Sequence, residues 1–150
     1  MRKIKCLMLI LSWRKGSCSG SVLREVNVLN SSKYTKFVEP IIITGPEIKR
    51  LIRLRNISNI TCVYQPRSLT DILGSLISIL DIVAKGCKLI KTHNPDFICS
   101  CTDVHISIIS GAILSLITGK AWIPIIQSSL IYMVSAPSEV EKKYDSTIKS

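Results

Sequence analysis

The sequence lacks several signatures that identify a protein's chemistry directly. It has no C-x-x-C pair, and its two histidines do not complete the spacing of a zinc site. Neither G-x-G-x-x-G nor the Gly-Lys-Ser/Thr of a triphosphate-binding loop occurs. Aromatic residues make up only 5% of the chain, and no recognised nucleic-acid-binding motif is present. We therefore expect no metal, no cofactor and no nucleic-acid partner, and a self-sufficient nucleotide enzyme is disfavoured.

Acidic residues are scarce in the first half of the chain. Residues 1–67 contain 13 Lys and Arg against three acids, whereas residues 68–150 contain seven of each kind. The net charge of +10 therefore belongs to the first half. Such an asymmetry favours an anionic partner, for example a membrane surface or a phosphorylated substrate.

The six cysteines do not suggest a disulfide framework. Four of them fall in predicted strands, where cysteine behaves as a small buried hydrophobic residue. These four are Cys6, Cys62, Cys99 and Cys101. We predict reduced structural thiols, which indicates a cytoplasmic setting.

Short apolar runs alternate with segments of helical periodicity. Apolar residues that recur every three or four positions from Leu69 to Ala84, after a capping box at Ser68–Asp71, predict the clearest helix, which continues to about Lys91. Pro40 suggests that the second strand lies at an edge or begins only at Ile41. The predicted strands are residues 4–11, 37–44, 60–64, 97–101 and 122–127. The predicted helices begin near residues 22, 46 and 69 and after a cap at Thr102 or Asp103.

This alternation predicts an α/β fold of Rossmann-like type, with a parallel β-sheet covered by helices on both faces. With 47% hydrophobic residues, 150 residues suffice for one domain with a substantial core. We expect that domain to span residues 1–135. Residues 136–150 are expected to be a polar tail or the truncated start of a further helix.

Small residues follow the first predicted strand. They would let backbone amides and hydroxyl groups approach an anion at a helix N-terminus. In open α/β sheets, this junction is where ligands bind. The candidates for substrate binding are Gly16, Ser17, Ser19, Gly20 and Ser21. A solvated loop without a ligand is the alternative.

Polar residues also follow the fourth and fifth predicted strands. Asp103 and His105 are candidates for catalytic proton handling or substrate contact, because both lie at the predicted carboxyl edge of the sheet. The alternatives are a helix cap for Asp103 and a packed or solvated helix residue for His105. Thr102, Gln127 and Ser128 are further candidates for substrate binding.

The helix that begins near Pro46 has a basic side. Lys49, Arg50 and Arg53 lie opposite its apolar residues, a pattern suited to a membrane surface with anionic lipid head groups. An ordinary surface helix is the alternative. A small membrane protein is a different organisation: residues 106–119 are uncharged, but a bilayer span needs about 20 residues. The second limb of such a membrane hairpin, residues 121–138, contains two prolines.

The order of these marks resembles the N-terminal half of a GT-B glycosyltransferase, most like glycosyltransferase family 4. A first strand ends in a small-residue loop, a Pro-Asp opens a buried strand, an apolar helix ends in Gly, and an Ile-Pro begins the next strand. The resemblance covers roughly residues 3–130. Its marks are Gly16 to Gly20, Pro95-Asp96-Phe97-Ile98, Ile113 to Lys120, and Ile123-Pro124-Ile125-Ile126.

The resemblance implies an acceptor-binding half that transfers a hexosyl unit from a nucleotide-sugar to a glycan or lipid-linked acceptor. It implies a protein of the cytoplasm, at the inner face of the membrane. The sequence departs from the family because no His follows the Ile-Pro strand or the Pro-Asp strand directly. The donor-binding second domain of the family is absent, so we expect an incomplete catalyst, a fragment, or a subunit with a donor-domain partner chain. A non-catalytic Rossmann-like binding module or degenerate subunit is the alternative.

Overall fold

The computed structural model describes residues 2–11, 28–29, 31–51, 59–66, 70–101 and 105–125. Five parallel strands form one sheet in the order β3-β2-β1-β4-β5. The strands are β1 (Ile4–Ile10), β2 (Val38–Thr44), β3 (Ile60–Cys62), β4 (Phe97–Ser100) and β5 (Ala121–Pro124). The helices are α2 (Ser32–Phe37), α3 (Pro46–Leu51), α4 (Ile72–His93) and α5 (His105–Thr118).

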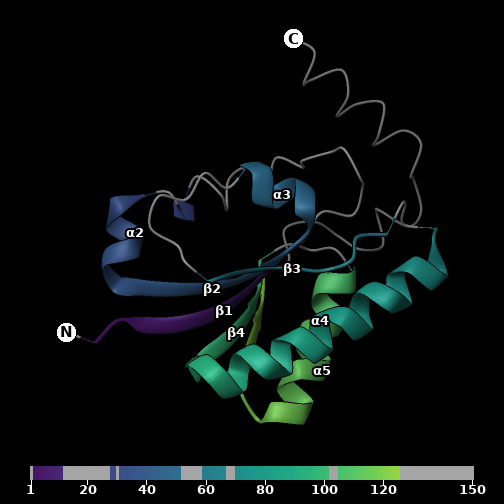
Figure 1. The fold of residues 1–150 in the computed structure, drawn as a ribbon. Helices are drawn as coiled ribbons and strands as arrows, with labels where there is room; N and C mark the ends of the chain where they lie inside the picture. The colour runs from purple at the N-terminus through teal and green to yellow at the C-terminus, as the bar shows by residue number, and fades with distance from the viewer. Residues whose placement is uncertain are drawn as a thin grey trace.

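The sheet is covered on both faces, as Figure 1 shows with α2 and α3 above it and α4 and α5 below it. The predicted α/β, Rossmann-like fold with a parallel sheet is therefore confirmed. The short helix α2 was not predicted. Strand β3 is shorter than predicted, because residues 63–66 have no strand structure.

The central strand β1 supplies side chains to two separate cores. Leu7 and Leu9 pack toward α4 and α5, whereas Met8 and Ile10 pack toward α2 and α3. All four side chains are buried, which is why β1 reads as a continuous apolar run rather than an alternating one. Fully burying an aliphatic side chain contributes about 1.5–3 kcal/mol, so this strand stabilises both layers at once.

The sequence suggested that the second strand lies at an edge of the sheet or begins only at Ile41, and both expectations are wrong. Strand β2 begins at Val38 and lies between β1 and β3, not at an edge. The amide of Ile42 donates to Asn59 on the β3 side, so Pro40, two residues earlier, points the same way. Strand β3 pairs only with residues from Ile42 onward. Pro40 has no N–H to donate, but no described strand is paired with β2 on that side of Pro40, so no hydrogen bond of this sheet is lost.

Helix α4 begins three residues later than the sequence suggested. Its N-cap is Asp71, whose carboxylate accepts a hydrogen bond from the amide of Gly74 at 2.8 Å. Ser68 and Leu69, the start of the predicted capping box, lie outside the described residues. The helix ends at His93, two residues beyond the predicted Lys91, and Asn94 closes it with a left-handed φ of 47°.

The side of α4 that packs on the sheet is not the side that carries most of the large aliphatic residues of its first half. Small residues face the sheet and α5, and Gly86 lies so close to Leu114 that an added Cβ would stand 2.7 Å from a Leu114 methyl. The buried residues of α4 are Gly74, Ser75, Ser78, Ile82, Gly86 and Ile90. The large aliphatic residues of its first half point to solvent instead. The periodicity predicted the helix correctly but did not identify its packed face.

Side chains of α4 cover the outer edge of β3. Lys85 Nζ donates to the Cys62 carbonyl at 2.9 Å, and Asp81 accepts from the Tyr64 amide at 2.9 Å. Ser78 Oγ donates to the Tyr64 carbonyl at 2.7 Å. These bonds satisfy backbone groups that an edge strand would otherwise leave open to another chain.

Helix α5 packs against the sheet through Ile106 and Leu114, and Gly119 ends it with a φ of 70° as predicted. Residues 106–118, expected as one limb of the membrane hairpin alternative, belong to this packed helix, and residues 121–124 form β5. Within the described part of the chain, no helix is long and apolar enough to cross a bilayer.

We predict that Leu80→Ala changes the free energy of unfolding by less than about 0.5 kcal/mol, because Leu80 is 70% exposed. The matched variant Ile82→Ala should cost about 2–5 kcal/mol, because Ile82 is fully buried in the α4–sheet core. Chemical denaturation followed by circular dichroism measures both. Equal losses for the two variants would contradict the orientation of α4.

Candidate functional site

The candidate site is the edge of the sheet at which the strands have their carboxyl ends. After β1 the chain adds β2 and β3 on one side of it and then β4 and β5 on the other, so the direction in which strands are added reverses between β1 and β4. The chain leaves β1 toward β2 and β3 through one layer of helices, and it reaches β4 and β5 through the other layer. Ligands of open α/β sheets bind outside the carboxyl ends of the strands at such a switch point. Helices α3, α4 and α5 all begin at this edge.

Hydrogen bonds fix the end of β1 against both neighbours. The Leu9 carbonyl accepts from the Cys101 amide at 3.0 Å and from Ser107 Oγ at 3.3 Å. The Ile10 carbonyl accepts from Thr44 Oγ1 at 2.7 Å. These contacts join the ends of β1, β2 and β4 to the start of α5. The edge is therefore a rigid frame from which the connecting loops depart.

A second chain of hydrogen bonds joins α5 to β4 and to the edge strand β5. Trp122 Nε1 donates to Ser100 Oγ at 3.0 Å, and Ser100 Oγ donates to the Ser107 carbonyl at 2.8 Å. Gly111 lies against the Trp122 indole, where a Cβ would stand 2.4 Å from Nε1. This contact fixes the start of α5 relative to β4 and β5.

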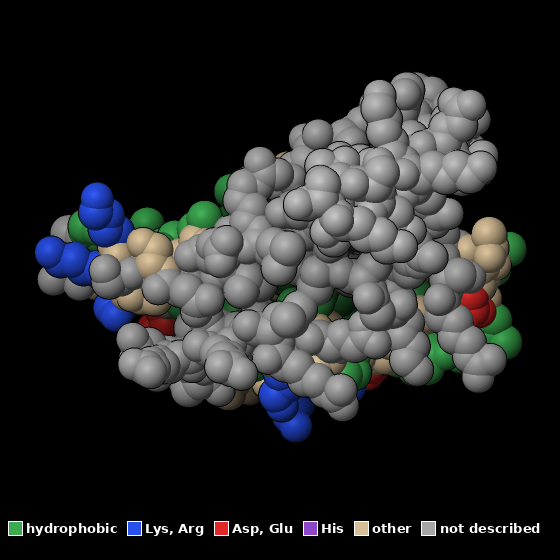
Figure 2. Space-filling model, turned by 90° about the horizontal axis from the view of Figure 1, so that it is seen from above, with side chains coloured by type: hydrophobic (Ala, Val, Ile, Leu, Met, Phe, Trp, Pro, Cys, Tyr) green, Lys and Arg blue, Asp and Glu red, His purple; other side chains and the backbone are tan. Residues whose placement is uncertain are grey.

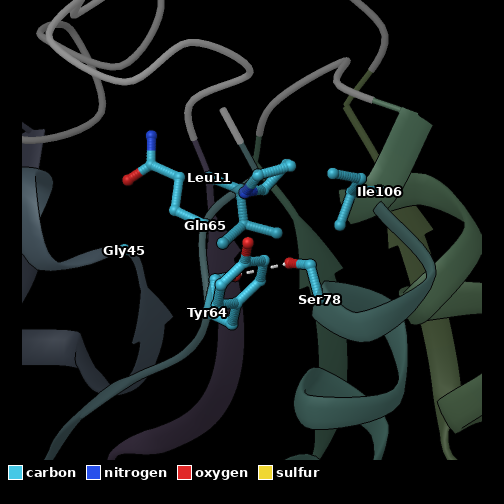
Figure 3. A pocket seen from close by; sticks show the side chains of 7 residues that line it. Leu11, Gly45, Tyr64, Gln65, Ser78 and Ile106 are labelled. Atoms are coloured by element: carbon cyan, nitrogen blue, oxygen red, sulfur yellow. Dashed lines mark hydrogen bonds between the residues drawn. The ribbon is translucent and has the colours of Figure 1, made fainter. Parts of the chain in front are cut away.

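A small pocket opens at this edge between β1, β2 and the segment after β3 (Figure 3). Its volume is about 10 Å³, which is near the minimum for one water molecule. Figure 3 shows the bond from Ser78 to Tyr64 that crosses the pocket wall. The lining residues are Leu11, Gly45, Tyr64, Gln65, Pro66, Ser78 and Ile106. The described part of the site is therefore a narrow, mostly apolar crevice.

His105 is the predicted catalytic residue whose position the structure gives. It is the first residue of α5, beside Ile106 of the pocket, and it is half-buried. Burial lowers the pKa of the His105 imidazole below its usual value of 6.5. A neutral imidazole at the carboxyl edge is able to accept a proton at neutral pH.

The other predicted catalytic and substrate-binding residues lie outside the described residues. In the sequence, residues 12–20 continue directly from Leu11 at the end of β1, and Thr102 and Asp103 continue from Cys101. Residues outside the description are Gly16, Ser17, Ser19, Gly20, Ser21, Thr102, Asp103, Gln127 and Ser128. Their roles stay predictions.

The predicted membrane-surface helix is only partly described. Lys49 is exposed on α3, whereas the apolar residue beside it, Ile48, is fully buried in the core. The Arg50 side chain and Arg53 lie outside the described part of the chain. Because Ile48 packs on the sheet, it is unavailable for contact with lipid.

Figure 2 views the molecule from the α2–α3 side. Lysine and arginine side chains gather at the left end, which is the end of α2 and the N-terminus in Figure 1. The exposed basic residues of that part of the chain are Arg2, Lys3, Lys33 and Lys36. They lie at the amino edge of the sheet, so this described positive charge is not at the candidate site.

Three cysteines meet on the α2–α3 side of the sheet. Cys101 Sγ lies 3.7 Å from Cys99 Sγ, and a hydrogen bond to Cys99 together with burial raises the pKa of the Cys6 thiol. No disulfide joins two of the cysteines that the structure describes. No group of three His, Cys, Asp or Glu side chains in the described ranges is arranged to hold a metal ion.

Sequence reasoning missed the contribution of the segment after β3. Tyr64 and Gln65 line the pocket from that segment, and Ser78 lines it from α4. The available signal was their position, since Gln65 follows the third predicted strand as directly as Thr102 follows the fourth, and Tyr64 is the last residue of that predicted strand. Ser78 gave no such signal, because it lies within the apolar periodicity of the helix.

No protein-family model matches the chain, and no curated protein matches it. Solved structures do match. A glycosyltransferase from Rickettsia africae ESF-5 aligns with a TM-score of 0.57 and 15% identity, over 92% of this chain and 34% of that one. A putative UDP-N-acetylglucosamine 2-epimerase from Listeria monocytogenes aligns with a TM-score of 0.55 and 11% identity, over 83% and 31%.

A third match is MurG from Acinetobacter baumannii, with a TM-score of 0.50 and 14% identity over 80% of this chain and 34% of that one. At these identities the likeness shows the fold alone. The chain spans about one third of each of the three structures. Its sheet therefore has the architecture of one half of a GT-B glycosyltransferase-like fold, which confirms the fold expectation.

We predict that burial of His105 makes the protein less stable at acidic pH. Because its folded pKa is lowered, the unfolded chain binds this proton more readily as the pH falls below 6.5, and the free energy of unfolding then decreases. The slope from one proton is at most about 1.4 kcal/mol per pH unit. Denaturation of wild type and His105→Asn between neutral and acidic pH measures it.

The variant His93→Asn is the control, because His93 ends α4 at the opposite edge of the sheet. His105→Asn should flatten the pH dependence and His93→Asn should leave that contribution in place. An unchanged slope in His105→Asn would show that the His105 imidazole does not contribute.

Proposed function

We propose that this chain is the acceptor-binding half of a glycosyltransferase that uses a nucleotide-sugar donor. The acceptor is a glycan or a lipid-linked sugar. The observation that carries the proposal is the switch point at the carboxyl edge, where β1 and β4 lie side by side and the segment that contains the small residues 16–21 follows β1 in the sequence. The match to a solved glycosyltransferase over 92% of this chain supports it.

His105 is the proposed general base. Its neutral imidazole accepts a proton from the acceptor hydroxyl as that oxygen bonds to the anomeric carbon and the nucleotide leaves. Asp103 serves the same centre as a second catalytic group or orients the acceptor through hydrogen bonds. A position at the first residue of α5, tied to β1 through Ser107, holds His105 in a fixed place.

The segments after β1, β4 and β5 supply the proposed substrate contacts. Backbone amides and hydroxyls of small residues accommodate phosphate or sugar oxygens without steric hindrance. The proposed contacts are Gly16, Ser17, Ser19, Gly20, Ser21, Thr102, Gln127 and Ser128. The narrow crevice beside Ile106 admits no whole sugar by itself, so a partner surface completes the cleft.

Catalysis requires a donor-binding half, either in a longer protein or in a partner chain. The coverage supports this part of the proposal, because this chain matches only about one third of each solved structure. We place the protein in the cytoplasm, where nucleotide-sugars and reduced cysteines occur together. Lys49, Arg50 and Arg53 are proposed as a basic surface toward the inner face of the membrane.

A non-catalytic binding module or degenerate subunit is the second candidate. The small volume of the crevice, about 10 Å³, favours it over an independent catalyst. It differs from the first candidate in one measurable respect. A binding module with a donor-domain partner gives complex formation without sugar transfer.

We predict that the chain transfers sugar from a nucleotide-sugar panel only when a donor-binding α/β partner is present. In that complex, His105→Ala should reduce turnover by about 100-fold or more, the usual contribution of a general base. Radiolabelled or fluorescent sugar transfer measures the rate. The pH profile of turnover should lose its acidic limb in the variant, because that limb reports protonation of His105.

The matched control is His93→Ala, which removes the other imidazole of the described chain at the amino edge. It should leave turnover within about twofold, since surface changes remote from a site have small effects. If neither the chain alone nor the complex binds, hydrolyses or transfers any nucleotide-sugar, the glycosyltransferase proposal fails. Equal losses in both histidine variants would remove His105 from the mechanism.

A further inference from the structure

A cavity lies at the amino ends of β1 and β2, beside α2, at the edge of the sheet opposite the candidate site. Figure 1 shows α2 and the N-terminus together at this end of the molecule. The volume of the cavity is about 170 Å³, far more than that of the crevice at the carboxyl edge. We call it the amino-edge cavity, and its lining residues are Lys3, Thr35, Val38, Glu39 and Pro40.

The size of the amino-edge cavity limits the kind of ligand that it admits. An engineered cavity of about 150 Å³ in another protein binds benzene, so this space suits a molecule of roughly six to nine non-hydrogen atoms. A nucleotide or an oligosaccharide is too large. The chemistry of the wall then decides which small molecule fits.

The wall of the cavity carries one positive and one negative side chain. Among the described residues, the Lys3 ammonium and the Glu39 carboxylate form no ion pair, either with each other or with another side chain. Lys3 is exposed and Glu39 is half-buried. Both charges are therefore open to a molecule that enters the cavity.

The other cations of the β1 end are bound elsewhere. Lys5 is the register partner of Glu39, but Lys5 Nζ donates to the His93 carbonyl at 3.4 Å. Arg2 is paired with Asp96 at 3.1 Å. A half-buried carboxylate without a cation beside it loses hydration and gains no partner in return. A ligand that brings a cation to Glu39 compensates that loss.

The remaining wall is mainly apolar. Val38 is half-buried and Pro40 is buried, and Pro40 offers no N–H to a ligand. The Thr35 hydroxyl already donates to the Ser31 carbonyl at 3.5 Å. A molecule in this cavity thus meets two opposite charges and an aliphatic surface.

We propose that the amino-edge cavity binds a free α-amino acid with a small aliphatic side chain. Lys3 binds its carboxylate, Glu39 binds its ammonium group, and Val38 and Pro40 contact its side chain. A phosphate or a simple carboxylate leaves Glu39 unpaired beside a like charge, and a simple amine leaves Lys3 unpaired beside a like charge. The proposal does not rest on the transferase function, because it uses no residue of the candidate site.

The test is calorimetric titration of the purified full chain with alanine, valine and leucine. At least one of them should bind with a dissociation constant of about 1 mM or lower. Isovalerate, which is valine without its ammonium group, and isobutylamine, which is valine without its carboxylate, should each bind at least about tenfold more weakly than valine. The bound amino acid should also raise the midpoint of thermal unfolding, because it binds the folded chain.

Two variants assign the charges. Glu39→Gln should lower the affinity for the amino acid by about tenfold or more without weakening the binding of isovalerate, which has no ammonium group. Lys3→Gln should lower it by a similar factor without weakening the binding of isobutylamine. Lys33→Gln, at an exposed position of α2 outside the cavity lining, is the matched control and should stay within about twofold of wild type. Circular dichroism checks that the variants are folded.

Three results overturn the proposal. The first is wild type that binds none of the three amino acids at about 10 mM. The second is isovalerate or isobutylamine that binds wild type as tightly as valine does, because the cavity is then a site for a single charge. The third is a Lys33→Gln variant that loses as much affinity as Glu39→Gln or Lys3→Gln, because binding then follows the overall charge of this end of the molecule. The comparison of ligands on wild type does not depend on the folding of any variant.

Discussion

Burial of β1 on both faces is the constraint on which the rest of the structure depends. The strand pairs with β2 over seven positions and with β4 over four, and its alternate side chains fill two cores. A strand in that position cannot show the alternating pattern of a half-exposed sheet, because both of its faces lose water. Since parallel strands need crossover helices, burying β1 also requires a helical layer on each side. Because the two helical layers lie on opposite faces, the direction in which the chain adds strands to the sheet reverses between β1 and β4.

The candidate site is a consequence of that reversal. The chain leaves β1 in one direction and returns beside it in β4, so the segments that follow both strands depart from adjacent points. The hydrogen bonds to the Leu9 and Ile10 carbonyls make this edge rigid before any ligand arrives. His105 stands at the start of α5 on that frame, and its burial favours the neutral imidazole. Ligand sites of open α/β sheets form at such an edge.

Helix α4 has two dissimilar faces, one buried against the sheet and α5 and one that exposes large aliphatic side chains. Gly74, Ser78 and Gly86 let the helix approach the sheet and α5 closely, as the contact between Gly86 and Leu114 demonstrates. Ile82 and Ile90 are the large buried side chains of that inner side, whereas Leu73, Leu76 and Leu80 lie on the outer side. Lys85, Asp81 and Ser78 meanwhile cover the backbone of the β3 edge. One helix therefore packs the core, protects a sheet edge and presents an aliphatic surface.

The sequence by itself determined the type and order of most elements. Buried apolar runs specified the strands at residues 4–10 and 97–100, and Pro46, Asn94 and Gly119 marked helix boundaries because their backbone preferences are local. The position of His105 at the start of a helix was predictable for the same reason. Tertiary structure alone decided that Pro40 lies inside the sheet, where β3 does not reach its missing N–H, and that Tyr64 and Ser78 share a pocket with Leu11. It also decided which side of α4 is packed. Periodicity defines the faces of a helix, but the distance to neighbouring elements determines whether small or large side chains turn inward.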